Sequence, residues 1–380
     1  MMTDKKPLRV AIIGTGSRSA YLYGPILNAL AEDVNLVSVW GRSEASARKL
    51  GEYLGLPWFT DINKLTNDTA PELGIVSVAK NANGAVGLMA VEAGLHVLLE
   101  TPIALDLAEA DAVISAASER GLKIEVAEQF HRRPNEQIKL KLIEAGIFGE
   151  VYSSFNDFAG HAYHGVSVLR SYLGFKTRPL RVTGTVKQYN LAPHLSRLAG
   201  SFDSRTEMQE HGIIEFEGGR LGIFHWTSVG YDSAIRWWRS SRFLAEKGMG
   251  ISIGDAVNQQ DTLSILAPGN EGRQDITLER RWERIDGGPL ESIIAHTGQP
   301  TQPIVKWSNP VYRKPKGSTI QWHDDEIAVA DCLLSLVNAV RNGIEPTYGA
   351  MQARIDQEIY LALQKSSAEN CRPVDLPFNV

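Results

Sequence analysis

The stretch Leu8-Arg-Val-Ala-Ile-Ile-Gly14-Thr15-Gly16-Ser17-Arg18-Ser19 decides the fold of the N-terminal part of this chain. An apolar run that passes directly into Gly-x-Gly and then into a helix is typical of the turn that seats a dinucleotide pyrophosphate. The first glycine permits the tight bend, and the second lets backbone N–H groups approach a phosphate at a helix N-terminus. Ser19 stands where the pattern prefers a third Gly or Ala. We therefore expect residues 14–19 to bind the phosphates of a dinucleotide.

The composition is that of an ordinary globular protein. A chain of 380 residues exceeds one ordinary hydrophobic core, so we expect two domains. The net charge of −5 provides no basic surplus for neutralising a nucleic-acid backbone, which argues against that partner. Two cysteines do not make a disulfide framework, and the sequence has neither a leader-like apolar segment nor a bilayer-spanning run. These features predict a cytoplasmic protein without a membrane partner.

The first 130 residues alternate strand and helix patterns. Continuous apolar runs, as expected for parallel strands covered on both faces, occur at residues 9–13, 35–40, 73–79, 96–100 and 123–127. Between them, Ser43 is placed to cap a helix that Gly55 ends, and Asp106 to cap another that Gly121 ends. Repeated βαβ units of this kind predict an α/β Rossmann domain over residues 1–130, with a doubly wound parallel sheet.

The pattern changes after Pro134. We expect a helix over 135–145, strands at 151–157, 180–189, 212–217, 220–228 and 240–253, and two closing helices over 324–341 and 350–367. Glu217-Gly218-Gly219 predicts a hairpin between two of these strands. Successive strands without intervening helices favour a large, open, mostly antiparallel sheet, so residues 131–380 are expected to form an α+β substrate-binding domain. The segment 255–317 supports little assignment.

The turn after the second strand bears on the choice of dinucleotide. An Asp or Glu there would bind the ribose 2′-hydroxyl and repel a 2′-phosphate, but this chain has Val39-Trp40-Gly41-Arg42-Ser43. The Arg42 guanidinium suits a phosphate, Ser43 adds a hydroxyl, and Arg18 could approach the same group. This pattern predicts NADP in preference to NAD, unless Arg42 is simply a solvated residue at a helix start.

Longer segments resemble the glucose–fructose oxidoreductase, inositol dehydrogenase and rhizopine-catabolism (Gfo/Idh/MocA) oxidoreductases. The resemblance rests on residues 10–19, 90–102, 143–151, the turn around Gly248, and residues 371–377. It implies a hydride-transferring enzyme that acts on a sugar, polyol or related small molecule, with an open-sheet domain that often forms a dimer face. It therefore also implies a homodimer or homotetramer, and it places Lys80, Glu100, Thr101 and His131 beside the cofactor. For His131, a packing or solvated role is an equal alternative.

The departures from the family pattern concern catalysis more than cofactor binding. Members usually have Glu-Lys-Pro at the end of the fifth strand, where this chain has Thr101. They also tend to carry Asp-x-x-x-His before a helix that ends in Leu-Gly. Counting back from Gly174 puts His164 at the histidine position and Gly160 at that of the aspartate. Asn83 stands where a histidine is common.

A general base is still required to take the hydroxyl proton when a carbon is oxidised, and histidine has a suitable pKa. His164 falls near the start of a predicted helix, where the helix dipole favours the neutral imidazole. We therefore assign His164 as acid/base, with Thr101, His161 and Tyr163 orienting the substrate. A role for His164 as a helix-start residue bonded to backbone is the alternative.

Several other residues allow two interpretations. His161 and His164 are three residues apart and could share a metal with Asp157, Glu128 or His211, although a pair without a third ligand is weak support and we expect no metal. Arg132 and Arg133 could bind an acidic substrate or be solvated. The tryptophans at 226, 237 and 238 could stack on sugar rings, but core or interface packing is more common.

Three hypotheses of function remain. The first is an NADP-dependent dehydrogenase or reductase of a carbohydrate or polyol. The second is an enzyme that retains its cofactor and uses transient oxidation for elimination or glycoside cleavage, without net redox change. The third is a nucleotide-binding regulator that has lost catalysis. Release of reduced cofactor, turnover without change in nicotinamide absorbance, and binding without turnover distinguish them.

Overall fold

The computed structural model describes residues 6–197, 199–230, 232–234, 239–254, 260–269, 271–283, 289–312 and 322–377. They divide into two compact units, the first within Met1–Arg132 and Asn309–Gln357, the second within Arg133–Glu283, Leu290–Ser308 and Glu358–Val380. The expected division has a single boundary at residue 130. In the structure the chain also returns to the first unit, with residues 309–357.

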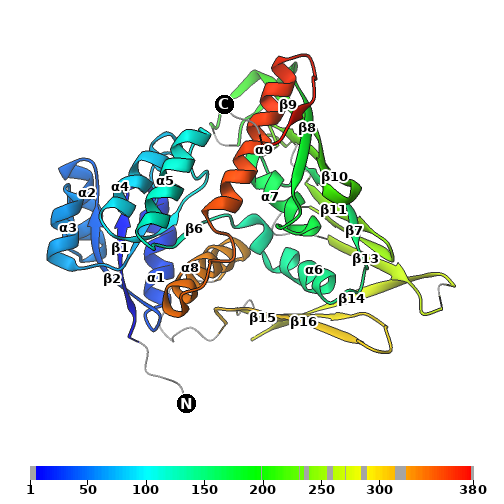
Figure 1. Ribbon diagram of the computed structural model, residues 1–380, viewed down its shortest axis with the longest axis horizontal. Coiled ribbons are helices and arrows are strands. Elements are labelled where there is room, and N and C mark those ends of the chain that lie inside the picture. The colour runs from blue at the N-terminus through cyan, green and yellow to red at the C-terminus, as the bar shows by residue number, and fades with distance from the viewer. Residues whose placement is uncertain are drawn as a thin grey trace. The chain divides into compact units, whose positions relative to one another are not determined.

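The first unit contains the Rossmann sheet, drawn in blue and cyan in Figure 1. Its strands are β1 (Leu8–Ile13), β2 (Val34–Trp40), β3 (Trp58–Phe59), β4 (Leu73–Val76), β5 (His96–Leu99) and β6 (Ile124–Val126). They pair in parallel in the order β3-β2-β1-β4-β5-β6. This is the order of a doubly wound dinucleotide-binding sheet, so the predicted fold class is confirmed here.

The helices and helical turns of the first unit are η1 (Ser19–Tyr23), α1 (Gly24–Ala29), α2 (Glu44–Leu54), α3 (Ile62–Thr69), η2 (Lys80–Ala82), α4 (Asn83–Glu92), α5 (Leu107–Glu119), η3 (Phe130–Arg132) and α8 (Asp324–Asn342). Two of them, α2 and α5, begin directly after the capping residues that the sequence predicts. The Ser43 hydroxyl accepts from the Ser46 N–H at the start of α2, and Asp106 accepts from the Glu109 N–H at the start of α5. Gly55 and Gly121, with φ of 69° and 65°, follow the two helices.

The second unit is built on one large mixed sheet. Its strands are β7 (Val151–Asp157), β8 (Pro179–Leu195), β9 (Phe202–Phe216), β10 (Arg220–Thr227), β11 (Ser240–Ala245), β12 (Gly248–Ile253), β13 (Gln260–Leu266), β14 (Arg273–Trp282), β15 (Leu290–His296), β16 (Ile304–Ser308) and β17 (Val374–Asp375). Their order is β16-β15-β14-β13-β12-β11-β7-β10-β9-β8-β17. Only β7 and β10 pair in parallel among the described strands of this sheet, which confirms that it is mostly antiparallel.

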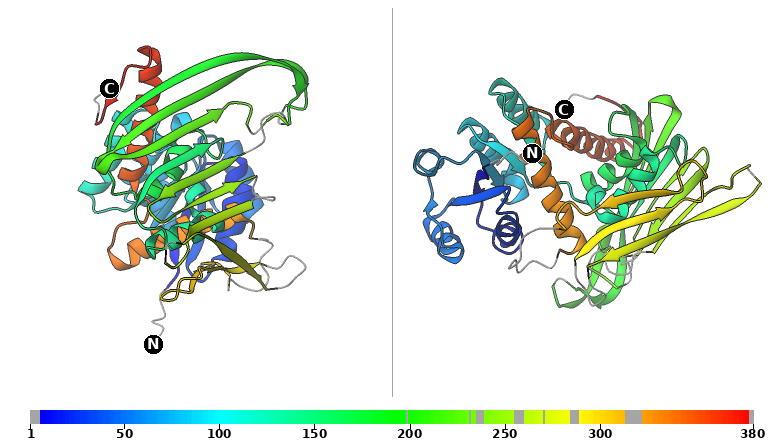
Figure 2. Two further views of the ribbon diagram at one scale, coloured as in Figure 1. Left: turned by 90° about the vertical axis from the view of Figure 1, so that its right-hand side faces the viewer. Right: turned by 90° about the horizontal axis from the view of Figure 1, so that it is seen from below.

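Two features of this sheet differ from the sequence interpretation. The run 240–253 is two strands joined at Glu246-Lys247, and the unassigned segment contributes β13 to β16. The strands β8 and β9 extend well beyond their apolar cores, as the long curved pair in the left view of Figure 2 shows. The hairpin at Glu217-Gly218-Gly219 (η4) is confirmed, with both glycines at φ of 72°.

Helices cover one face of this sheet. They are α6 (Pro134–Glu144), α7 (Ala162–Leu173) and the second part of α9 (Ala350–Ala368). Gly184 and Gly212 on β8 and β9 leave room for Leu363 of α9, since a Cβ at either would lie 2.6 Å from that side chain. No helix among the described residues is long and apolar enough to cross a membrane.

Candidate active site

The turn between β1 and η1 has the geometry that a phosphate-binding turn requires. Gly14 has φ of +126°, and a Cβ there would lie 2.0 Å from the Ser77 carbonyl oxygen, so only glycine fits. The Gly14 N–H donates to the Trp40 carbonyl at 2.9 Å, which ties the turn to the end of β2. A Cβ on Gly41 would meet Thr15 Cγ2 at 2.6 Å, so the backbone is packed closely on this side.

Gly16, two residues further, borders open space. A Cβ at this position would have no atom within 4 Å. Space beside the main chain of the turn is what a pyrophosphate needs in order to reach backbone N–H groups. Ser17 and Arg18 lead into a π-helical turn that begins at the fully buried Ser19, where the usual pattern has Gly or Ala. The residues present therefore fit a dinucleotide at this turn.

The Arg18 side chain pairs with Glu100 and is not directed toward Arg42, with which it was expected to share the 2′-phosphate. Its Nε donates to Glu100 Oε1 at 2.7 Å, and the Tyr23 hydroxyl donates to the same oxygen at 2.7 Å. Arg18 is thus directed to the end of β5 by an ion pair, and its expected approach to a 2′-phosphate has no support in these contacts. Burial, followed by the charge of Glu100, raises the pKa of Tyr23 well above its usual value. Tyr23 is therefore a neutral hydrogen-bond donor to Glu100.

The segment after β5 is held by Asn83 at the start of α4. The Asn83 amide donates to the carbonyl oxygens of Glu100 and of Pro102, the latter at 2.6 Å. Thr101 lies between these two residues and is partly exposed, and its N–H donates to Glu100 Oε2 at 3.3 Å. Asn83 replaces the family histidine with a residue that fixes the backbone on both sides of Thr101.

The remaining cofactor candidates of the first unit divide into exposed and buried residues. Arg42 and Ser43 are exposed at the end of β2, and the Ser43 hydroxyl is engaged as the cap of α2. Lys80 is exposed in η2, after β4. His131, in contrast, is 4% exposed, and its ring lies 5.1 Å from that of Tyr348. The structure thus shows His131 packed in the interior against Tyr348, which is the alternative to a place beside the cofactor.

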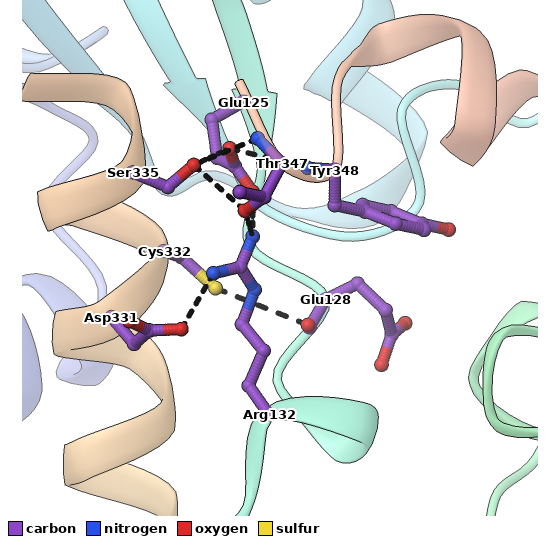
Figure 3. A network of polar contacts seen from close by, with 8 residues as sticks. All are labelled: Glu125, Glu128, Arg132, Asp331, Cys332, Ser335, Thr347 and Tyr348. Atoms are coloured by element: carbon purple, nitrogen blue, oxygen red, sulfur yellow. Dashed lines mark hydrogen bonds and ion pairs between the residues drawn. The ribbon is translucent and has the colours of Figure 1, made fainter. Parts of the chain in front are cut away.

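A buried ion-pair network holds the segment that carries His131 (Figure 3). The Arg132 guanidinium bonds Glu125 on β6, Asp331 on α8 at 2.7 Å, and the Thr347 hydroxyl at 2.6 Å. Glu125 also accepts from the Ser335 hydroxyl at 2.6 Å. Burial raises the pKa of Glu125 to about 7, against the charge of Arg132. Arg132 is thus structural, neither solvated nor available to an acidic substrate.

In the second unit, α7 brings three of the four predicted catalytic residues together at its first turn, whereas Thr101 belongs to the first unit. His161 is the N-cap residue, and His164 is the third residue of the helix. The His164 ring lies 4.7 Å from that of His161 and 4.5 Å from that of Tyr163, measured between centroids. His164 is 6% exposed.

The structure explains why Gly160 replaces the aspartate of the family pattern. A Cβ at Gly160 would lie 2.7 Å from the Gly165 nitrogen and 2.8 Å from the His164 carbonyl carbon. Instead, Asn156 on β7 holds this segment, because its side chain accepts from the Gly160 N–H and donates to the Gly160 carbonyl, both at 2.8 Å. The backbone of α7 fills the place in which a carboxylate would stand.

A fully buried polar cluster fixes the direction of α7. The Tyr172 hydroxyl donates to Glu136 on α6, and the Lys139 ammonium lies 2.9 Å from the same carboxylate. Lys139 also donates to Ser252 on β12. Burial and the Glu136 carboxylate raise the pKa of Tyr172 well above its usual value. The orientation of the helix that presents His164 is therefore set by charge-assisted contacts in the interior.

Sequence reasoning missed a second set of polar residues near the histidines. Glu210 on β9 is fully buried and accepts from Tyr360 at 2.9 Å and from Gln364 at 2.6 Å, both on α9. Burial raises the pKa of Glu210. Trp226 on β10 is opposite Glu210, and its ring is 5.9 Å from that of His161. Only the spacing of Tyr360 and Gln364 on one helix face could have indicated this site. Residues 237 and 238 lie outside the described part of the chain.

The alternative of a metal centre finds no ligand set in the described residues. No group of three or more His, Cys, Asp or Glu side chains there could hold a metal ion. Asp157 is bonded to His225 at 2.9 Å, and the His211 ring stacks on His225 at 4.2 Å. Glu128 belongs to the first unit, where its side chain accepts from the Phe130 N–H.

Comparisons with known proteins agree with this geometry. Residues 8–128 match the family model described as "Oxidoreductase family, NAD-binding Rossmann fold". Among curated proteins, the chain is 26% identical over 147 residues to the scyllo-inositol 2-dehydrogenase (NADP(+)) IolW of Bacillus subtilis, covering 38% of this chain and 39% of that protein. It is 26% identical over 178 residues to the D-xylose dehydrogenase of Paenarthrobacter nicotinovorans, covering 43% of this chain and 46% of that one. The chain thus matches less than half the length of these relatives.

The likeness to solved structures extends over both units. A crystal structure of an NAD binding oxidoreductase from Klebsiella pneumoniae superposes with a TM-score of 0.72, covering 98% of this chain and all of that one. The sequence identity is 16%, so the likeness shows the fold alone. The same architecture therefore occurs in an oxidoreductase in which the two units are also joined in one chain.

Proposed function

Because its Rossmann domain belongs to the Gfo/Idh/MocA family of oxidoreductases, we propose that this protein is an NADP-dependent enzyme that transfers hydride at a hydroxyl or carbonyl carbon of a sugar or polyol. The observation that carries the proposal is the turn at Gly14–Gly16, with its obligatory glycine and the open space beside the second one. The names of the curated relatives support the substrate class, since they are an inositol and a xylose dehydrogenase.

Each part of the dinucleotide can be assigned to residues of the first unit. The backbone of residues 14–19 would hold the pyrophosphate, and the exposed Arg42 guanidinium would pair with the 2′-phosphate. None of residues 41–43 carries a carboxylate that would repel that phosphate. Lys80, Glu100 and Thr101 follow β4 and β5, at the end of the sheet where a nicotinamide binds in this fold.

Titration with NADP and NAD tests the preference. The wild type should bind NADP more tightly than NAD, and R42A should lower the affinity for NADP while sparing that for NAD. The control is K49A, which removes an exposed cation from the middle of α2. Tighter binding of NAD by the wild type, or equal effects of R42A and K49A, would contradict the assignment.

The second unit supplies the proton chemistry in this proposal. When bound, the nicotinamide ring accepts the hydride. His164, in the first turn of α7, takes the proton of the hydroxyl as the carbon–oxygen bond becomes a carbonyl, and returns it in the reverse direction. Thr101 cannot act as a base at neutral pH, so it would hydrogen-bond the substrate oxygen, as would Tyr163 and His161.

Turnover of H164A tests this role, because loss of a general base typically lowers the rate by about 10²–10⁴-fold. The matched control is H296A, which removes an exposed histidine of β15 bonded to Glu279. Full turnover by H164A with scyllo-inositol or D-xylose, under conditions where the wild type is active, would remove His164 from the mechanism.

A second function is favoured by one observation, the threonine at the position of the family lysine. An enzyme that keeps its cofactor and uses transient oxidation for elimination or glycoside cleavage needs no release of reduced dinucleotide. Product formation without a lasting change in nicotinamide absorbance would identify it. Binding without turnover would identify a regulator that has lost catalysis.

We also propose that the protein forms a homodimer or homotetramer in the cytoplasm. Gly212 faces α9, so its neighbours on β9 point to the opposite face of the sheet. There Ile213 is 49% exposed and pairs with Ile223, which pairs in turn with Phe155. An apolar sheet face of this kind suits a second copy of the chain. Light scattering should give a mass of two or four chains, and I213K should reduce it.

A further inference from the structure

A buried carboxylate oxygen of the second unit lacks a partner. Glu210 is 0% exposed, and its Oε1 receives both the Tyr360 hydroxyl and the Gln364 amide. Its Oε2 accepts no hydrogen bond from any described residue. Leaving such an atom unsatisfied is costly, so a buried carboxylate oxygen of this kind calls for an explanation, such as a ligand or a functional role.

Trp226 presents a complementary atom at the paired position. Glu210 and Trp226 are directly opposite in the antiparallel pairing of β9 and β10, so their side chains lie on the same face of the sheet. The Trp226 Nε1–H is buried and has no hydrogen-bond partner among the described residues. An unsatisfied acceptor and an unsatisfied donor are thus neighbours on the face that the helices cover.

Both residues connect to the first turn of α7. The Trp226 ring lies 5.9 Å from that of His161, which lies 4.7 Å from that of His164. On the other side, burial, then Glu210 and then Tyr163 raise the pKa of Tyr360, so the Tyr163 and Tyr360 hydroxyls are electrostatic neighbours. The pair is therefore part of the same side-chain cluster as the proposed acid/base.

We propose that Glu210 Oε2 and Trp226 Nε1 form a hydroxyl-recognition subsite for a polyhydroxylated substrate, an inference that rests on the proposed function. The carboxylate oxygen accepts a hydrogen bond from one substrate hydroxyl, and the indole N–H donates to the oxygen of a neighbouring one. The aromatic face of Trp226 packs against the C–H groups of the same molecule. Glu210 is thereby a specificity-determining residue, whereas the proton of the reaction goes to His164.

A subsite of this kind discriminates by leaving buried groups unpaired. An analogue that lacks the recognised hydroxyl leaves Oε2 as unsatisfied as in the free protein, and sites built for a hydroxyl reject such analogues strongly. Tyr360 and Gln364 act as positioning residues, because they hold Oε1 and so direct Oε2. The recognised substrates are neutral polyols or sugars, since an anionic group would be repelled by Glu210.

The experiment compares E210Q and W226F with the wild type, and uses E215Q as a matched control, since Glu215 is exposed on the same strand. The substrates are whichever of scyllo-inositol and D-xylose the wild type oxidises, and the monodeoxy analogues of that compound. E210Q should raise KM about 10–100-fold with a much smaller change in kcat, and it should abolish the discrimination against one monodeoxy analogue. NADP affinity and the parameters of E215Q should match those of the wild type.

W226F keeps an aromatic ring and loses only the N–H donor. If circular dichroism shows that E210Q is unfolded, W226F alone tests the subsite. Unchanged KM and unchanged analogue discrimination in the folded variants would overturn the subsite while leaving the proposed function intact. If the wild type turns over no polyol or sugar, the proposed function fails separately. Calorimetric titration of scyllo-inositol and D-xylose then tests the subsite alone, and binding that is absent, or equal in wild type and E210Q, would overturn it.

Discussion

Replacing Arg132 by methionine should destabilise the Rossmann unit by about 3–5 kcal/mol, because it leaves the buried Glu125 carboxylate without its cation. Arg132 is 4% exposed and bonds Glu125, which is 0% exposed, together with Asp331 and Thr347 (Figure 3). For a unit of this size, each kcal/mol shifts Tm by roughly 2–4 °C, so Tm should fall by about 6–20 °C. The penalty should be smaller at pH 6 than at pH 9, because the abandoned Glu125 carboxyl can then take up a proton.

Differential scanning calorimetry and urea unfolding measure this loss, and two controls accompany them. R181M breaks the exposed pair with Asp375 and should leave Tm unchanged. The double variant R132M/E125L replaces the buried pair by apolar side chains and should recover most of the stability, since such replacements are often neutral. A Tm of R132M close to that of the wild type at both pH values would refute the idea that this network holds β6 to α8.

Three further predictions concern single positions. G16A should keep the wild-type Tm, because its Cβ meets no atom, yet weaken NADP binding at least tenfold in calorimetry; G14A should lower Tm as well, because its Cβ meets the Ser77 carbonyl. G160D should lower Tm without raising turnover, because the added side chain collides with the backbone of α7. The folded pKa of Glu125, about 7, exceeds its unfolded value of 4.5, so wild-type stability should fall as pH rises between these values, and calorimetry of E125Q should show a shallower fall.

The Rossmann unit is predictable because its local patterns agree with its tertiary structure. The apolar run of β1 is buried on both faces, and each helix cap tested by the structure accepts the expected backbone N–H. The strand β14 does not meet this condition. It reads Arg-Gln-Asp-Ile-Thr-Leu-Glu-Arg-Arg-Trp, and only Ile276 in it is buried, so its pairing partners rather than its composition make it a strand. A strand of this kind leaves little hydrophobic pattern in the sequence.

The predicted site residues lie close together where one local segment carries them. His161, Tyr163 and His164 lie together because they share one turn of helix, and residues 14–19 because they share one loop. Arg18 shows the limit of this reasoning. Its partner Glu100 is 82 residues away, and nothing in the opening motif indicates that the guanidinium is drawn to the end of β5.

The cluster of Glu210, Tyr360 and Gln364, to which the proposed substrate specificity is assigned, also depends on contacts between residues distant in the sequence. Its contacts join residues 150 and 154 positions apart, and they become visible only when α9 lies on β9. On the sequence, Glu210 is one of several charged residues in a long polar strand, where a solvated role is the natural expectation. Burial reverses that expectation, because a carboxylate oxygen without a partner among the described residues is costly to bury and calls for an explanation. The proposed acid/base of this chain therefore follows from a local motif, whereas the proposed substrate subsite rests on long-range pairing of residues that no motif contains.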